Sequence, residues 1–280
     1  MYFYHGYALG VASTIPGNVF TQCTCALSVA GGVQDQTVTN PESPLISFDS
    51  IKSHVSGNEI HPFEEGCLDA YATEASVVIK NLKIKDKPGG KDRITAALVQ
   101  ARIRSQHWTG DYDASTVVCG SKFEGLQVDG KELKIVLSND LSEQYSTFSA
   151  MQLDFMNGFS RNAVNACLVG RDLKEADANT EDLRAAYDAY QEQIVLPRLK
   201  SAVVSSFIAK VDGGGLKTWG PIVAIPDLGN LYLGEVIVWP WMRCLTMFRL
   251  ELLSGGTICG GSAGSNGTGW PPGSTPPDWP

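Results

Sequence analysis

The first residues of the chain alternate between large and small side chains, as the residues of a β-strand do. The large ones share one face of an extended chain: Phe3, Tyr7, Leu9, Val11 and Ile15. The small ones share the other face: Gly6, Ala8, Gly10 and Ala12. Because successive side chains of a strand point to opposite faces, we expect one face to meet a core and the other to meet a second surface at close range.

Further strands are predicted where apolar residues alternate between turn residues. They are expected at residues 22–30, 45–55, 75–83, 93–107, 115–127, 201–211, 220–224, 230–239 and 243–253. The run Val128-Asp129-Gly130-Lys131 lies between alternating residues and predicts a tight hairpin.

Helical spacing appears between these two groups of strands. Apolar residues recur every three or four positions over residues 142–159 and again over residues 180–194. Thr180 can cap the second helix, and Leu183, Tyr187 and Ile194 form its apolar stripe. The sequence therefore predicts a two-helix insertion at about residues 141–195.

Together these elements predict a mainly β fold, with an antiparallel sandwich or a barrel-like body. We expect one β-rich domain over residues 1–255, interrupted by the helical insertion. Residues 256–280 are glycine-rich and then proline-rich, so we expect an extended tail that is held by another surface, either the body of the same chain or a neighbouring copy.

Eight segments with strand and turn patterns extend over nearly the whole body: FYHGYALGVAS, ALSVAGG, ISFDSIKSHVSG, VVIKNLKIKDK, DRITAALVQARIRSQH, GSKFEGLQVDGKELKIVL, IPDLGNLYLGEVIV and RCLTMFRLELLSGG. In these segments the chain resembles a group of uncharacterised bacterial β-rich proteins. The pattern GLxVxG, followed much later by a glycine-rich close, is also distantly similar to the choice-of-anchor β-domains of bacterial surface proteins. The resemblance implies a β fold and assigns no catalytic residue, and the helical insertion departs from the surface-domain pattern.

Charge and composition narrow the classes of partner. A net charge of -8 and a pI near 5.0 argue against nucleic acid, because phosphate binding needs a basic face. No apolar run reaches the length of a membrane span, and the first residues lack the regions of a secretion signal. The seven cysteines form no compact framework, so we expect reduced thiols and a cytoplasmic location, with an extracellular or surface-associated location as the alternative.

No motif in the sequence predicts a catalytic residue, a cofactor or a metal. The run Gly260-Gly261-Ser262-Ala263-Gly264 matches the G-x-S-x-G elbow of hydrolases, but glycines and prolines follow it where the elbow requires a helix. Gly213-Gly214-Gly215 precedes neither a Lys-Ser/Thr pair nor a helix, so a phosphate site is not expected.

Possible metal ligands are interpreted as ordinary structural residues. The densest cluster is His61, Glu64, Glu65, Cys67 and Asp69, which lacks a second cluster at zinc-site spacing. Asp111 and Asp113 lack the glycine and the distal glutamate of a calcium loop. The other histidines (His5, His54 and His107) and the Cys23–Cys25 pair are interpreted in the same way.

Aromatic residues suggest an interface. Trp239, Trp241, Trp270 and Trp279 stand beside prolines, and Tyr7 lies on the first strand. Tryptophan buries a large area at a low entropic cost, which suits an interface anchor. Trp239 and Trp241 can also simply complete the core.

Two hypotheses follow. The first is a non-enzymatic structural protein that self-associates with other copies of itself through strand edges, including the small face of the first strand, and through the C-terminal tail. The second is an enzyme or small-molecule-binding protein with a pocket between the sheet and the helical insertion. Tyr145, His107, Asp140 or Glu143 could line that pocket.

Overall fold

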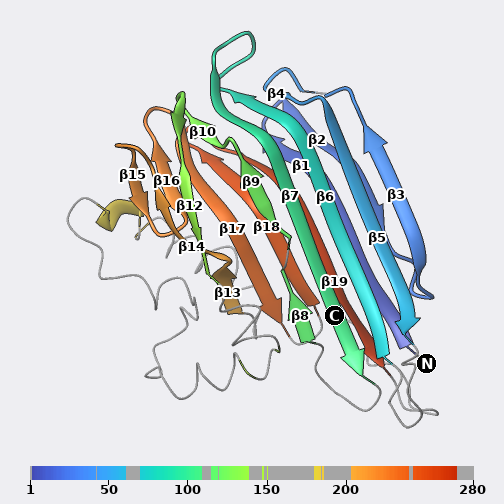
Figure 1. The fold of residues 1–280 in the computed structure, drawn as a ribbon. Coiled ribbons are helices and arrows are strands. Elements are labelled where there is room, and N and C mark those ends of the chain that lie inside the picture. Colours follow the sequence, from blue (N-terminus) through green and yellow to red (C-terminus); the bar gives the residue numbers. More distant parts are fainter. Residues whose placement is uncertain are drawn as a thin grey trace.

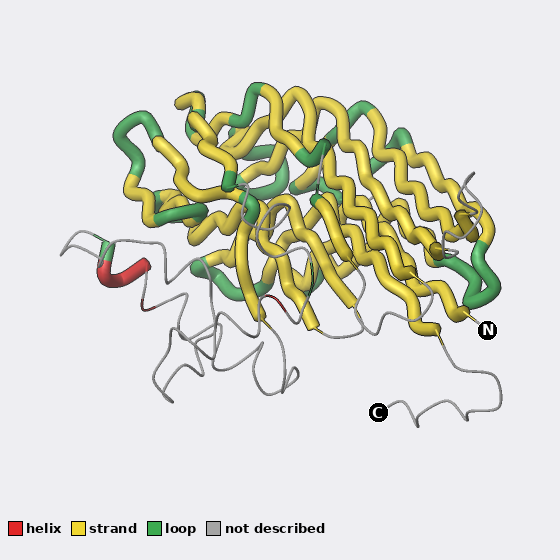
Figure 2. Tube along the Cα trace, turned by 60° about the horizontal axis from the view of Figure 1, so that its bottom comes forward, coloured by secondary structure: helices red, strands yellow, loops and turns green. Residues whose placement is uncertain are grey.

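Two β-sheets face each other across an apolar core in the computed structural model of the chain (Figure 1). Seen from below, the strands form two stacked layers (Figure 2). The structure describes residues 2–41, 43–60, 70–108, 115–118, 120–138, 147, 150, 180–183, 185, 203–239 and 242–269.

Sheet A is an eight-stranded antiparallel sheet with the order β15-β16-β17-β18-β19-β1-β2, and β13 also pairs with β17. Its strands are β1 (Tyr2–Ile15), β2 (Asn18–Ala26), β13 (Val203–Ser206), β15 (Lys217–Trp219), β16 (Ile222–Ile225), β17 (Gly229–Trp239), β18 (Met242–Leu252) and β19 (Thr257–Gly269). The first and the last described strands are therefore neighbours in the middle of the sheet.

Sheet B is a nine-stranded antiparallel sheet with the order β11-β10-β7-β6-β5-β3, and β4, β8 and β9 add to its long strands. Its strands are β3 (Gly32–Val38), β4 (Ile46–Ser47), β5 (Ser50–Ile60), β6 (Ala70–Lys85), β7 (Asp92–Trp108), β8 (Ser115–Val117), β9 (Lys122–Glu124), β10 (Gln127–Val128) and β11 (Lys131–Glu132). A third, two-stranded sheet pairs β12 (Lys134–Leu137) with β14 (Ile208–Asp212).

Alternation along the long strands explains the core. On β7, Val99, Ala101 and Ile103 are fully buried, while Gln100 and Arg102 between them face outward. Arg93 at the start of β7 also joins the two sheets. Its guanidinium donates to Asp129 at 2.5 Å and to the Pro226 carbonyl, in the turn before β17, at 2.6 Å.

The prediction of a mainly β, antiparallel fold is confirmed, and most predicted strands lie within a few residues of observed ones. The hairpin is also confirmed: Val128 pairs with Lys131, and Asp129 and Gly130 both have positive φ. Three observed strands were not predicted: β3, because GVQDQTV has no apolar alternation, the short β15, and the glycine-rich β19.

Of the two architectures left open, the structure shows the sandwich, because the described strands form separate sheets rather than a closed barrel-like body. The two sides of the sandwich differ. On one side, β11 continues into β12 and β13 into β14, so the β12–β14 pair bridges the sheets. On the other side, the edges of the two sheets are β2 and β3, which no described strand bridges.

A crease crosses sheet A at one level. One residue of each of five neighbouring strands lies at this level: Gly234 on β17, Met247 on β18, Gly261 on β19, Gly10 on β1 and Cys23 on β2. These residues stand opposite one another, but they do not form ladder pairs, whereas the residues on either side of them do. Gly234, Gly261 and Cys23 have positive φ values of 62°, 62° and 58°. At this level one residue of each strand leaves the ladder without a shift in register, and the side-chain alternation reverses, so β1 buries even-numbered residues before Gly10 and Val11 and Ser13 after it.

The prediction of an extended tail from residue 256 is wrong for residues 257–269. They form β19, paired with β1 on one side and with β18 on the other. Glycine is needed there because neighbouring rings lie over the strand: a Cβ at Gly264 would stand 2.3 Å from Cε1 of Tyr7, and one at Gly260 would stand 2.5 Å from Cζ of Phe248. Residues 270–280 lie outside the described residues.

We expected the small face of the first strand to contact a neighbouring molecule, but it faces sheet B. A Cβ at Gly10 would stand 2.6 Å from Cγ2 of Ile51, and one at Gly6 would stand 3.1 Å from Cγ2 of Thr73. Both edges of β1 are paired within the chain, so strand addition at β1 is ruled out.

The predicted two-helix insertion lies almost wholly outside the described residues. Of the second predicted helix, the structure describes Glu181, Asp182 and Leu183 as helical. No helix in the described part of the chain has the length and hydrophobicity that a membrane crossing requires.

Candidate functional site

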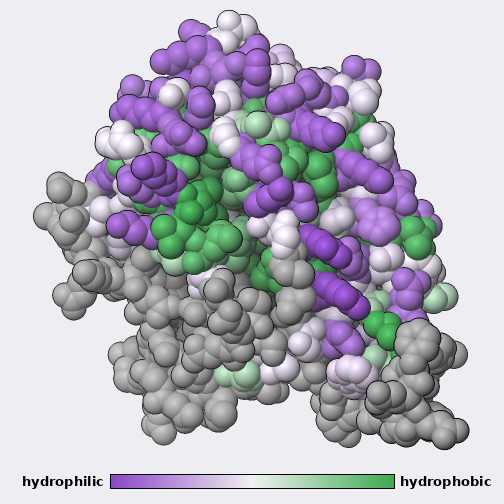
Figure 3. Space-filling model, viewed as in Figure 1, coloured by the Kyte–Doolittle hydropathy of each residue, from purple (hydrophilic) through white to green (hydrophobic). Residues whose placement is uncertain are grey.

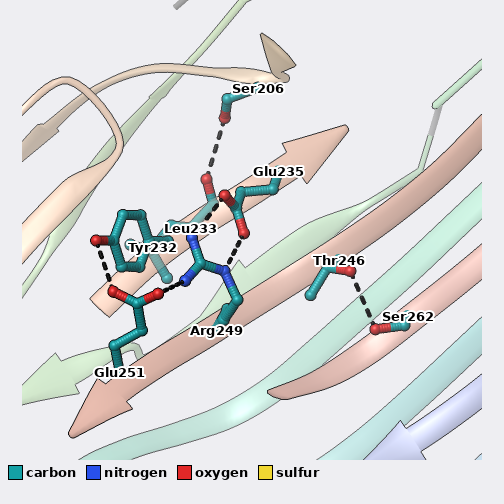
Figure 4. A network of polar contacts seen from close by, with 8 residues as sticks. All are labelled: Ser206, Tyr232, Leu233, Glu235, Thr246, Arg249, Glu251 and Ser262. Carbon is teal, nitrogen blue, oxygen red and sulfur yellow. Dashed lines mark hydrogen bonds and ion pairs between the residues drawn. The ribbon is translucent and has the colours of Figure 1, made fainter. Parts of the chain in front are cut away.

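A buried charged network lies on the outer face of sheet A, where it faces away from sheet B (Figure 4). Arg249 on β18 donates to both carboxylate oxygens of Glu235 on β17, at 2.7 and 2.9 Å. It also donates to Glu251 at 2.5 Å, and Glu251 accepts a hydrogen bond from the Tyr232 hydroxyl at 2.9 Å. The Arg249 guanidinium carbon stands 3.7 Å from the centre of the Tyr232 ring.

The strand register explains this geometry. Tyr232 is the direct cross-strand partner of Arg249, which places its ring beneath the guanidinium. Glu235 lies on the other side of the crease, and the reversed alternation there returns its side chain to the outer face beside Arg249. The sequence gives no signal for this pairing, because it depends on the reversal of the side-chain alternation at Gly234.

The network is shielded from solvent. The Arg249 and Glu235 side chains are each 8% exposed, whereas Glu251 is 32% exposed. Next to it, Leu183 from the helical segment packs with Trp219, Ile222 and Tyr232. Burial raises the pKa of Tyr232, and the nearby Glu251 carboxylate raises it further. The hydrogen bonds of Arg249 to both carboxylates show a satisfied ion network, which is the condition for burying charge in a folded chain.

Thiols and hydroxyls continue across the same face. The Tyr7 hydroxyl lies 2.6 Å from Sγ of Cys244, and Thr246 and Ser262 share a hydrogen bond at 3.1 Å. Burial raises the pKa of the Cys244 thiol to about 12, and burial also raises the pKa of Cys259. Thiols with raised pKa values are protonated at neutral pH, so they are poor nucleophiles.

The second candidate is the open side of the sandwich, at the edges β2 and β3. Gly32 to Thr37 are all exposed, although a strand packed on a core normally buries alternate residues. Val33 is 55% exposed there and Val19 on β2 is 72% exposed. A slot of about 320 Å³ lies between the two strands and is lined by uncharged side chains that include Thr21, Thr24, Gln36 and Thr39.

The contacts of the Cys23 thiol show which backbone N–H and C=O groups of β3 point toward β5 and which point away from it. Sγ of Cys23 lies 3.3 Å from the Gln36 carbonyl and 3.4 Å from the Ile51 carbonyl, so the two oxygens are within about 7 Å of each other. Gln36 pairs with Ser53, and Val38 pairs with Ile51. Two carbonyl oxygens this close must both lie in the space between β3 and β5. If each carbonyl pointed away from the other strand instead, the two oxygens would be separated by the strand spacing plus the lengths of both C=O bonds.

The alternation of an antiparallel ladder then fixes the rest of β3. Gln34, Gln36 and Val38 bond to β5, and the N–H and C=O groups of Val33, Asp35 and Thr37 point to the free edge. On the outer face, Asp35 bonds to Nδ1 of His54 at 2.9 Å and lies 4.0 Å from Nζ of Lys52. No described strand pairs with this edge, so within the described part of the chain it offers three residues of regular backbone.

The residues predicted as interface anchors lie in different settings. Tyr7 is half-buried on the outer face of sheet A, and its hydroxyl and ring contact Cys244 and Gly264 within the chain. Trp239 is the last residue of β17. Trp241, Trp270 and Trp279 lie outside the described residues, so their predicted role stays a prediction.

The residues considered for chemistry are not brought together. His107 is buried on the inner side of β7, with its ring 5.6 Å from that of Tyr2. His5 is half-buried on β1, where burial lowers its pKa, and His54 bonds to Asp35 on the surface. Cys23 and Cys25 are free thiols on β2.

The predicted clusters around residues 61–69 and 111–113 and the predicted pocket residues Tyr145, Asp140 and Glu143 lie outside the described residues. Among the residues that are described, no three His, Cys, Asp or Glu side chains group as a metal site. Ser262 of the G-x-S-x-G run lies inside β19 and bonds to Thr246, in the middle of a sheet.

Two further surface features lie on or near sheet B. An open groove of about 500 Å³ passes over β4, β6 and β7, where Asn81, with a positive φ of 52°, donates to Asp49 at 2.5 Å. Hydrophilic side chains cover much of the face seen in Figure 3, and hydrophobic ones gather near β12. Val136 and Leu137 on that strand are each 53% exposed.

Comparison with known proteins places the chain in one family. The family model of a domain of unknown function, DUF8256, matches residues 2–239, which is most of the chain, so the chain belongs to that family. The matched range contains β1 to β17, including both strands of the open side, whereas Arg249 and Glu251 follow it. No curated protein and no solved structure matches the chain.

Proposed function

We propose that the chain is a non-enzymatic structural module that self-associates with other copies of itself through the strand edges at the open side of the sandwich. The observation that carries the proposal is β3, a regular edge strand with free backbone groups at Val33, Asp35 and Thr37 and with both faces exposed. Such an edge is a template for pairing with another strand.

The side chains of the open side support this proposal. β2 carries no charged residue, and β3 carries only Asp35, which lies 2.9 Å from Nδ1 of His54 and 4.0 Å from the ammonium of Lys52. Neither strand contains the proline or lysine that commonly protects an edge from pairing. The opposite side of the sandwich is bridged by β12 and β14, which leaves the β2–β3 side as the available one.

The test is the native mass of the full chain by light scattering, over a range of concentrations. The net charge of -8 opposes association, so the measurement belongs at about 0.15 M salt, where repulsion is screened. We expect a mass above that of one 30.1 kDa chain, rising with concentration. A mass of one chain at all concentrations contradicts the proposal.

Asp35→Pro is the matched edge variant. The Asp35 N–H points to the free edge, so proline removes one donor for a neighbour without removing a bond to β5. We expect the variant to stay folded by circular dichroism and to lose association. Asp35→Asn keeps the N–H and is the control, which should associate at least as well as the natural chain.

The alternative is an enzyme or small-molecule-binding protein with a pocket between sheet A and the helical insertion. One observation favours it: a charged network lies next to Leu183 on the outer face of sheet A. Against it, Arg249 bonds to both Glu235 and Glu251, so the charges of the network are paired with one another rather than directed at a ligand. Self-association is therefore the better-supported function.

A further inference from the structure

We infer that β3 pairs with β3 of a second copy, antiparallel and about a two-fold axis, in the register that places Gln36 opposite Gln36 of the second copy. The inference rests on the proposed self-association and specifies its partner strand and its register. A two-fold contact of this kind uses the same surface on both copies and closes at two.

The free backbone groups restrict the possible registers to three. Hydrogen bonds across the new interface must come from Val33, Asp35 and Thr37, because the residues between them bond to β5. If at least two of these residues pair across a two-fold axis, the axis passes at Gln34, at Asp35 or at Gln36. Each choice pairs odd-numbered residues with odd-numbered residues, so each is sterically a proper antiparallel ladder.

Charge excludes the register centred on Asp35. It places the two Asp35 carboxylates directly opposite each other on the outer face, where cross-strand side chains are about 5 Å apart. Like charges in this position are destabilising. Lys52 lies 4.0 Å from Asp35 and is 62% exposed, so it neutralises only part of this repulsion.

The two remaining registers differ in what meets Asp35. The register centred on Gln34 places Val33 of the second copy opposite Asp35, and its ladder runs toward Gly31 and Gly32. These glycines have φ values of 85° and 101°, which ends the extended chain. The register centred on Gln36 places the Thr37 hydroxyl opposite the Asp35 carboxylate, and it runs along extended residues to Val38, the last residue of β3.

The row across the dimer in the favoured register is complementary. Lys52 pairs with Thr37 on β5 and β3, and Asp35 of the second copy follows, with its own His54 beyond it. A hydroxyl thus meets a carboxylate, and a lysine stands one strand further away. On the other face, Gln34 meets Val38 of the second copy, and the two Gln36 amides face each other on the axis.

Single cysteine variants test the register directly. In the favoured register, Gln36 forms a non-hydrogen-bonded pair with its own copy, with Cα atoms about 4.5 Å apart, which suits a disulfide. We expect Gln36→Cys to form a dimer that resists SDS when diamide oxidises the two thiols, and mass spectrometry to identify the residue 36–36 cross-link. Gln34→Cys and Asp35→Cys, treated in the same way, should give no more cross-linking than the natural chain with its seven cysteines.

The outcomes separate the register from the function. A cross-link at Gln34→Cys or Asp35→Cys instead, in a chain whose native mass is above one copy, overturns the register and keeps self-association. Association without a cross-link in any of the three variants overturns β3 pairing and moves the contact to another surface. A native mass of one copy, with no cross-link, overturns both.

Discussion

Replacing Arg249 by methionine tests whether the charged network on sheet A holds the fold together. Methionine keeps the aliphatic length over the Tyr232 ring and removes the charge. Glu235 then stays buried without its partner, since its side chain is only 8% exposed. Removing one partner of a buried ion pair costs about 3–5 kcal/mol, because an uncompensated charge remains. This is a large part of the total stability of a domain, which is about 5–15 kcal/mol.

Two companion variants separate charge from packing. Glu235→Gln leaves Arg249 paired with Glu251 and should cost about 2 kcal/mol, the value of a charged hydrogen bond. The double variant Arg249→Met with Glu235→Gln has no buried unpaired charge. It should therefore be more stable than Arg249→Met alone by at least about 1 kcal/mol, although it carries one more substitution.

The free energy of unfolding is measured by urea titration with far-UV circular dichroism. The variants are compared where the slope of this free energy against urea concentration is the same. Glu251→Gln is the control, because its side chain is 32% exposed and its loss should cost less than about 1 kcal/mol. Two results refute the reasoning. One is a cost below about 1 kcal/mol for Arg249→Met, and the other is a double variant whose cost is the sum of the single ones.

Two further predictions concern the glycines and thiols of sheet A. Gly264→Ala should destabilise the chain by about 1–3 kcal/mol in the same urea assay, because the new Cβ would stand 2.3 Å from the Tyr7 ring. The cost should fall in a Tyr7→Ala background, and an equal cost there contradicts the steric explanation. Burial raises the pKa of Cys244 to about 12, so the unfolded thiol ionises first and stability should fall as pH rises from about 9 to about 12. Cys244→Ala should weaken this alkaline loss, and an unchanged pH profile would exclude the thiol as its source.

The sequence predicted the elements that depend on the alternation of apolar and polar residues or on a local turn preference. The long strand β7 was expected at residues 93–107 and is observed at Asp92–Trp108, because buried and exposed residues alternate along its whole length. The hairpin at Asp129-Gly130 was also expected, since this pair has a local conformational preference. β3 has exposed residues on both faces and no core to meet, so no apolar pattern marks it.

The structure of the glycine-rich segment could not be predicted from the local sequence pattern. Residues 257–269 have little to bury, and the sequence analysis placed them in a tail. They are buried because side chains of the adjacent strands, such as Phe248 and Tyr7, cover them. The charged network was hidden by the same kind of non-local cause. Glu235 reaches Arg249 only because the side-chain alternation reverses at Gly234, and nothing near either residue in the sequence indicates their pairing.

The crease also bears on where copies of the chain would meet. It ends at Cys23, whose positive φ of 58° interrupts the edge strand β2 near its middle. Such an irregular residue protects an edge, since it interrupts the row of backbone groups with which a second strand would pair. β3 lies on the other sheet, and its residues between Val33 and Val38 pair with β5 without a gap and have no positive φ. Of the two edges on the open side, only β3 therefore offers an uninterrupted row of free backbone groups, and this is why the proposed pairing runs through β3.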